Sequence, residues 1–223
     1  MKKKDFHHYT LDKSFFEGHE RAVEIGKFLN VGINHYDSTR DLNKDKHILG
    51  KYGEIGFLHY LLGIGLEEKK DFYYPNILHL GKGDECDVIL LPSGKKVDVK
   101  THEAICGPFE DFLGNIKSES LVKPMDYYVF TWVMKDRSRL TVTGWCTREE
   151  FMDNSISHDI GERLTPSFVV LEPCNCISVG DLHPLYTLPE IARVESSNEL
   201  AETYTPTPIH PLPAQRTMAG WFG

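Results

Sequence analysis

The sequence lacks a long hydrophobic run and an excess of positive charge, and each absence excludes a class of protein. No apolar stretch approaches the ~20 residues that a membrane helix needs, and the basic residues near Met1 are not followed by the apolar segment of a secretory signal. We therefore expect a cytoplasmic protein without a membrane partner. The net charge of −8 argues against a broadly basic coat for nucleic acid but leaves room for local basic clusters.

Cysteine is also scarce. The 223-residue chain has five thiols, an odd number in mostly apolar surroundings, which is typical of reduced cysteines. They are Cys86, Cys106, Cys146, Cys174 and Cys176. The pair Cys174 and Cys176 with His183 leaves a zinc site or a regulatory role as an alternative, although no Cys-x-x-Cys pair accompanies it.

The composition divides the chain into one domain and a tail. Residues 1–192 hold enough apolar material for a full core, and we expect helices at 14–30 and 41–63 before a core at 76–171. Residues 193–223 are rich in Ser, Glu, Thr and Pro, which is typical of a flexible tail. The aromatic residues near its end leave open that the tail binds a protein partner.

Two helices are predicted before the core. Ser14 and Glu17 have the spacing of a capping box, and an apolar pattern continues to about residue 30. The second pattern, at 41–63, contains Glu54 between Gly53 and Gly56. Glycines are costly inside a helix, so we expect this helix to pack closely on a sheet and to direct Glu54 toward it.

A hairpin is predicted where two apolar runs flank Pro92 to Gly94. A two-residue loop of Ser93 and Gly94 would set Asp87 opposite Lys100 and Ile89 opposite Asp98. The two acids and the lysine would then share one face of the sheet. A loop one residue longer or shorter would place Asp98 on the other face.

This arrangement predicts metal chemistry. Two carboxylates on neighbouring strands, Asp87 and Asp98, suit Mg²⁺ or Mn²⁺, which prefer oxygen ligands. Lys100 would orient a water molecule and neutralise charge in the transition state. A surface hairpin with solvated charges is the alternative, but unpaired acids are costly in a sheet this apolar.

The rest of the core follows from local patterns. Residues 104–121 have mixed polarity and predict a loop with at most a short helix, whereas 127–134 and 140–145 predict a second hairpin. A capping box at 147–150 predicts a short helix. A strand is expected at 167–171 and a closing helix within 181–191.

A helix with an acid, a hairpin with Asp, and Asp-x-Lys on the following strand resemble the PD-(D/E)xK nuclease superfamily. The matching residues are Glu54, Asp87, Asp98 and Lys100. The resemblance implies an α/β fold with a restriction-endonuclease-like core: a central mixed sheet of four to five strands flanked by helices. It also implies a Mg²⁺-dependent endo- or exonuclease, with the backbone carbonyl of Val99 in the metal shell, of the kind found in phages, mobile elements, restriction or repair. No proline precedes Asp87, which departs from the family pattern.

Further candidates lie near these four residues. Glu85 would face the same side as Asp87 and is an alternative ligand, and His47 on the second helix is a secondary metal candidate because some members of the superfamily bind manganese through a helix histidine. Lys135, Arg137 and Arg139 form a basic turn that would contact phosphates. The expected partner is nucleic acid, DNA rather than RNA, with a homo-oligomer left open. A non-catalytic binding module on the same fold is the alternative function.

Overall fold

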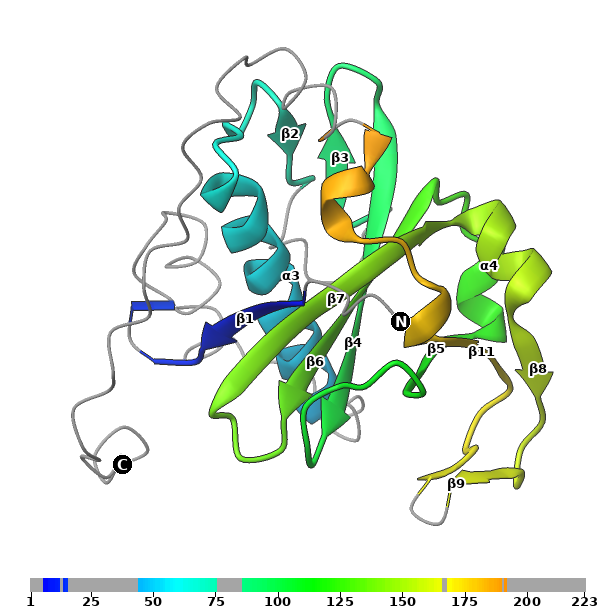
Figure 1. Ribbon diagram of the computed structural model, residues 1–223. Coiled ribbons are helices and arrows are strands. Elements are labelled where there is room, and N and C mark those ends of the chain that lie inside the picture. Colours follow the sequence, from blue (N-terminus) through cyan, green and yellow to red (C-terminus); the bar gives the residue numbers. More distant parts are fainter. Residues whose placement is uncertain are drawn as a thin grey trace.

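A mixed six-stranded sheet with a long helix against one face organises the protein (Figure 1). The computed structural model describes residues 6–12, 14–15, 44–75, 86–165, 168–189 and 191. The strand order is β1-β7-β6-β4-β3-β2. The strands are β1 (His7–Thr10), β2 (Phe72–Tyr73), β3 (Val88–Leu90), β4 (Lys95–Ala104), β6 (Tyr127–Met134) and β7 (Arg139–Thr147). The α/β class is as expected, and the sheet has one strand more than the upper limit of the prediction.

Strands β4 and β6 form the parallel centre of this sheet, whereas the other neighbours pair antiparallel. The β6–β7 hairpin confirms the second predicted hairpin. It consists largely of β-branched and aromatic residues, and most of its side chains are buried, as expected for strands covered on both faces.

Helix α3 (Lys44–Gly63) lies within the range predicted as a helix, 41–63, and packs on the sheet through its glycines. A Cβ atom on Gly53 would lie 1.9 Å from Oγ1 of Thr101, and one on Gly56 would lie 2.3 Å from a methyl carbon of Leu140. Neither contact is possible for a real side chain. The missing side chains therefore allow the helix backbone to approach β4 and β7 closely, which brings Glu54 to the sheet.

The opposite face of the sheet is covered by a second, smaller layer. This layer contains a three-stranded sheet and a short helix, α4 (Arg148–Asn154). Its strands are β5 (Leu113–Lys117), β11 (Cys174–Ser178) and β8 (Ile156–His158). Buried side chains thus form two large cores, one between α3 and the sheet and one between the sheet and this layer, and a small third cluster of Val170, Cys174 and Cys176.

Local capping explains α4, whereas two other predictions need correction. Thr147 and Glu150 form the expected capping box. The segment 104–121 is not only a loop, because β5 lies within it and pairs with the distant β11. Much of the closing segment forms two 3₁₀ turns, η4 (Val179–Asp181) and η5 (Leu185–Thr187), and among its described residues only Pro189 and Ile191 are α-helical.

Short strands and a further 3₁₀ turn complete the described chain. They are η3 (Ser118–Val122), β9 (Arg163–Thr165) and β10 (Phe168–Val169). The strand predicted at 167–171 corresponds to β10. In the described part of the chain, no helix is long and apolar enough to cross a membrane.

Several predictions fall outside the described residues. These are the helix at 14–30 beyond Phe15, the residue Glu85 and the tail at 193–223. The backbone of His47 lies in α3, but its side chain is also outside the description.

Candidate metal and phosphate site

The β3–β4 hairpin has a four-residue loop, so its predicted register is wrong by two residues. Val88 pairs with Val97 and Leu90 with Lys95, and the N–H of Gly94 donates to the carbonyl of Leu90 at 2.9 Å. Pro92 has no backbone N–H to donate to a neighbouring strand, which favours its position in the loop. A shift of two residues preserves the side-chain alternation, so the expected sharing of one face is unaffected.

Asp87 lies where β3 begins and completes the hydrogen bonding of β4 with its side chain. Its backbone N–H donates to the carbonyl of Val97 at 3.0 Å. Its Oδ2 accepts the N–H of Val99 at 2.7 Å. The carboxyl group thus takes the place of a strand carbonyl directly before the first residue of β3. This hydrogen bond fixes the position of the carboxyl group beside β4.

Asp98 and Lys100 are neighbours on one face of β4. Val97 and Val99 pack into the core on the α3 side, so alternation places Asp98 and Lys100 on the other face. Nζ of Lys100 lies 2.6 Å from Oδ2 of Asp98, and the two side chains retain 23% and 13% exposure. The pair is therefore largely shielded but still reachable from solvent.

Glu54 lies on α3, which packs on the opposite face of β4 from Asp98, and its charge acts on the carboxyl group of Asp87. Glu54 is a buried acid, 6% exposed, and its two carboxylate oxygens lie 2.7 and 2.8 Å from Nζ of Lys51. The hydroxyl of Tyr74 donates to the backbone carbonyl of Glu54 at 3.1 Å, which helps to fix this turn of the helix. Lys51 precedes Glu54 by three residues, so both side chains lie on one side of α3.

The charges of Glu54 and Asp98 both act on Asp87. Burial raises the pKa of Asp87 well above its ordinary value, and the nearby carboxylates of Glu54 and Asp98 raise it further. Lys51 and the N–H of Val99 act in the opposite direction. A buried carboxyl group whose pKa is raised by neighbouring carboxylates is a common property of cation and catalytic sites.

Glu54 and Asp98 each already have a lysine partner. Across the described ranges, no group of three or more His, Cys, Asp or Glu side chains is arranged to hold a metal ion. In this geometry the ammonium groups of Lys51 and Lys100 lie against Glu54 and Asp98. A cation that used all three acids would therefore require these side chains to move.

Aromatic and imidazole groups border Asp98 and Lys100. Tyr128 pairs with Asp98 across the strands, and burial and this carboxylate raise the pKa of the phenol to about 12. His102 follows Lys100 on the same face and accepts the N–H of Asn115 at 3.3 Å. Burial and the charge of Lys100 lower the pKa of His102 to about 4. Both groups are thus neutral near pH 7.

The predicted basic turn joins β6 and β7. Nη2 of Arg137 lies 3.0 Å from Oε1 of Glu103, and its guanidinium is 6.0 Å from the ring centre of Tyr52. Within the described atoms, Nη1 of Arg137 and Nε of Arg139 are buried without an acceptor. Lys135 is exposed. The turn therefore offers positive charge and buried donors that an anion could satisfy.

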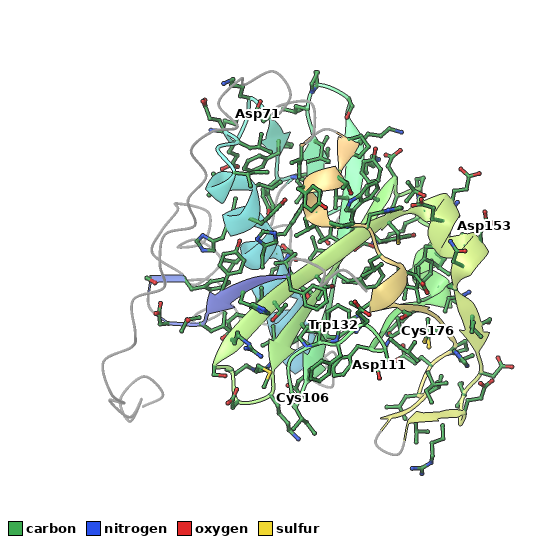
Figure 2. All side chains as sticks on the ribbon, viewed as in Figure 1. Asp71, Cys106, Asp111, Trp132, Asp153 and Cys176 are labelled. Atoms are coloured by element: carbon green, nitrogen blue, oxygen red, sulfur yellow. The ribbon has the colours of Figure 1, made fainter. Side chains whose placement is uncertain are left out.

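The thiols of the zinc alternative lie in the second layer. Sγ of Cys174 and Sγ of Cys176 are 3.9 Å apart on β11, and Figure 2 shows Cys176 apart from α3. His183 instead bonds through Nε2 to Oε1 of Glu150 at 2.7 Å and packs against Trp145. Burial and the neighbouring Cys174 raise the pKa of Cys176 to about 12, so this thiol is protonated at neutral pH.

Lys51 was not among the predicted site residues, although the sequence contains a signal for it. A lysine three residues before a glutamate in a predicted helix commonly forms an ion pair. Compared with protein-family models and with curated proteins, the sequence matches none. What the site does must therefore be argued from its own residues.

Proposed function

We propose that this protein is a metal-dependent nuclease that hydrolyses phosphodiester bonds, with DNA as the expected substrate. The supporting observation is that two acids, Glu54 and Asp98, act electrostatically on the buried Asp87, beside the Asp98–Lys100 pair. Carboxylates that repel one another are stabilised by a shared divalent cation, and oxygen donors suit Mg²⁺ or Mn²⁺. The residues therefore fit such an ion chemically.

Each residue has a distinct role in this proposal. Glu54, Asp87, Asp98 and the carbonyl of Val99 would hold the cation. When bound, that ion would polarise the scissile phosphate and favour attack by water. The ammonium of Lys100 would orient the attacking water and stabilise negative charge that develops on the phosphate oxygens. The hydrogen bond from Val99 to Asp87 preorganises the acid on which the arrangement centres.

A non-catalytic nucleic-acid-binding or protein-interaction module is the second candidate. The observation that favours it is the pairing of Glu54 with Lys51 and of Asp98 with Lys100, because paired acids are less available to a metal. In such a module the same cluster would serve only to stabilise the fold.

Incubation with defined substrates tests the proposal. Plasmid DNA, single-stranded DNA and RNA would be incubated with the full chain in Mg²⁺, Mn²⁺ or EDTA. We expect cleavage with either metal, none in EDTA, and none by Asp98→Ala. Asp126→Ala is a matched control, because Asp126 also pairs with a β4 lysine, Lys95, at 2.7 Å but lies outside the cluster. Failure to cleave any substrate would favour the binding module, and cleavage by Asp98→Ala would reject the assigned site.

A further inference from the structure

The ion pair between Lys51 and Glu54 occupies the carboxylate that the proposed metal needs. One ammonium group lies 2.7 and 2.8 Å from the two oxygens of Glu54. The side chains are only 15% and 8% exposed, so water weakens their attraction little. A divalent cation cannot bind both oxygens of Glu54 in this geometry unless the ammonium moves aside.

Lys51 also lies within electrostatic reach of Asp87, since its charge lowers the pKa of that carboxyl group. The ammonium therefore neutralises part of the acid cluster in the absence of metal. Lysine is suited to such a role, because its ammonium is a compact charge on a flexible stem and can be repositioned.

The balance of charge indicates what happens when a divalent ion enters. With every group ionised, the acids Glu54, Asp87 and Asp98 exceed Lys51 and Lys100 by one negative charge. A divalent ion reverses the balance to one positive charge, which disfavours an ammonium held beside it. The ion and Lys51 thus compete for the same oxygens.

We propose that Lys51 is a displaceable counter-ion that sets the Mg²⁺ concentration at which the site fills. This inference rests on the proposed function, and it adds a control element. Lys51 stabilises the metal-free cluster, and metal binding includes the cost of breaking the Lys51–Glu54 pair. Removing the ammonium makes the metal-free protein less stable and its affinity for Mg²⁺ higher.

A Mg²⁺ titration of thermal stability tests this inference without measuring catalysis. The full chain would be freed of metal with EDTA, dialysed and titrated with Mg²⁺ alone while the melting temperature is recorded. Lys51→Met is expected to melt below the wild type without metal, because Glu54 loses its buried ion pair with Lys51. Its half-saturating Mg²⁺ concentration is expected to fall about tenfold, within the usual range of coupling between two bound ions.

Lys70→Met is the matched control. Lys70 pairs with Glu67 at the same spacing of three residues, at 3.1 Å, but both side chains are 67% exposed. This variant is expected to bind Mg²⁺ as the wild type does. If Lys51→Met does not fold, Lys51→Gln removes the charge while keeping a hydrogen-bond donor, and the same fall is expected.

The outcomes separate the two proposals. A wild type that responds to Mg²⁺ and cleaves nucleic acid, with unchanged half-saturation in the Lys51 variants, would overturn the displacement and leave the proposed function standing. A wild type with neither a Mg²⁺-dependent shift nor cleavage would overturn both.

Discussion

Asp87 and Val99 are joined by a hydrogen bond of 2.7 Å, in which a side chain completes the pairing of a strand. The bond spans the opening of the β3–β4 hairpin. Because Asp87 is also the acid on which Glu54 and Asp98 act, this contact links the stability of the sheet to the geometry of the candidate site.

Substitution of Asp87 separates these two roles. Asp87→Ala leaves the N–H of Val99 without its acceptor, and we expect a loss of about 1–3 kcal/mol in the free energy of unfolding. Asp87→Asn retains an acceptor and removes the charge that Glu54 and Asp98 repel. In urea without added metal, the unfolding midpoint of Asp87→Asn should be equal to or above that of the wild type. An Asn variant as unstable as the Ala variant would show that the repulsion is unimportant.

The sequence predicts much of this site because its signals are local. The Pro92 to Gly94 turn, the helix that carries Glu54 and the capping box at Thr147 each depend on a few neighbouring residues. The structure contains all three features. Apart from Lys51, whose signal was local, what was missed depends on how separate segments pair.

The register of the hairpin and the second sheet illustrate that limit. The loop length depends on how Leu90 and Lys95 pair, and glycine and proline alone allowed a loop of two residues. Strand β5 has mixed polarity and pairs with β11, about sixty residues later in the chain. Since no periodic pattern marks such a strand, its partner cannot be inferred from local sequence.

The close packing of α3 predicts opposite effects of alanine at two glycines. Gly53→Ala would place a Cβ 1.9 Å from Thr101 and 2.5 Å from Thr131, so we expect a loss of about 1–3 kcal/mol or more. Gly50 lies in the same helix with nothing within 4 Å of its Cβ position. Gly50→Ala should therefore stabilise the protein by about 0.5–1 kcal/mol. Urea unfolding measures both, and equal effects would contradict the packing described.

The lowered pKa of His102 predicts that the folded protein loses stability in acid. Its pKa falls from an ordinary 6.5 to about 4 in the folded protein, through burial and the charge of Lys100. Between these values the unfolded chain binds a proton that the folded chain does not, so stability decreases as pH falls from about 6.5 toward 4. The contribution is at most about 1.4 kcal/mol per pH unit.

His102→Gln removes this titration and can still accept the N–H of Asn115. We expect its unfolding free energy, measured in urea at several pH values, to decrease less steeply between pH 6.5 and 4 than that of the wild type. Parallel pH profiles for the two proteins would contradict the assigned role of His102.

The basic turn predicts a salt-dependent contribution to nucleic-acid binding. Arg137→Ala and Arg139→Ala each remove one guanidinium, and each should lower the slope of log affinity against log salt by about 1 if the residue contacts a phosphate. Fluorescence anisotropy with a labelled duplex over a range of KCl concentrations measures the slope. Arg163→Ala, an exposed arginine of β9, is the control and should leave it unchanged. Equal slopes in all variants would exclude the turn from the interface.

Single-turnover cleavage by Lys100→Ala and Lys95→Ala would show whether Lys100 acts in phosphodiester hydrolysis. Both lysines lie on β4 and pair with an aspartate, Lys100 with Asp98 and Lys95 with Asp126. With saturating Mg²⁺ and a labelled DNA substrate, the account predicts that Lys100→Ala lowers the rate about 10²- to 10³-fold, whereas Lys95→Ala remains close to the wild type. Equal rates for Lys100→Ala and the wild type would contradict a nuclease centred on Asp87, Asp98 and Lys100.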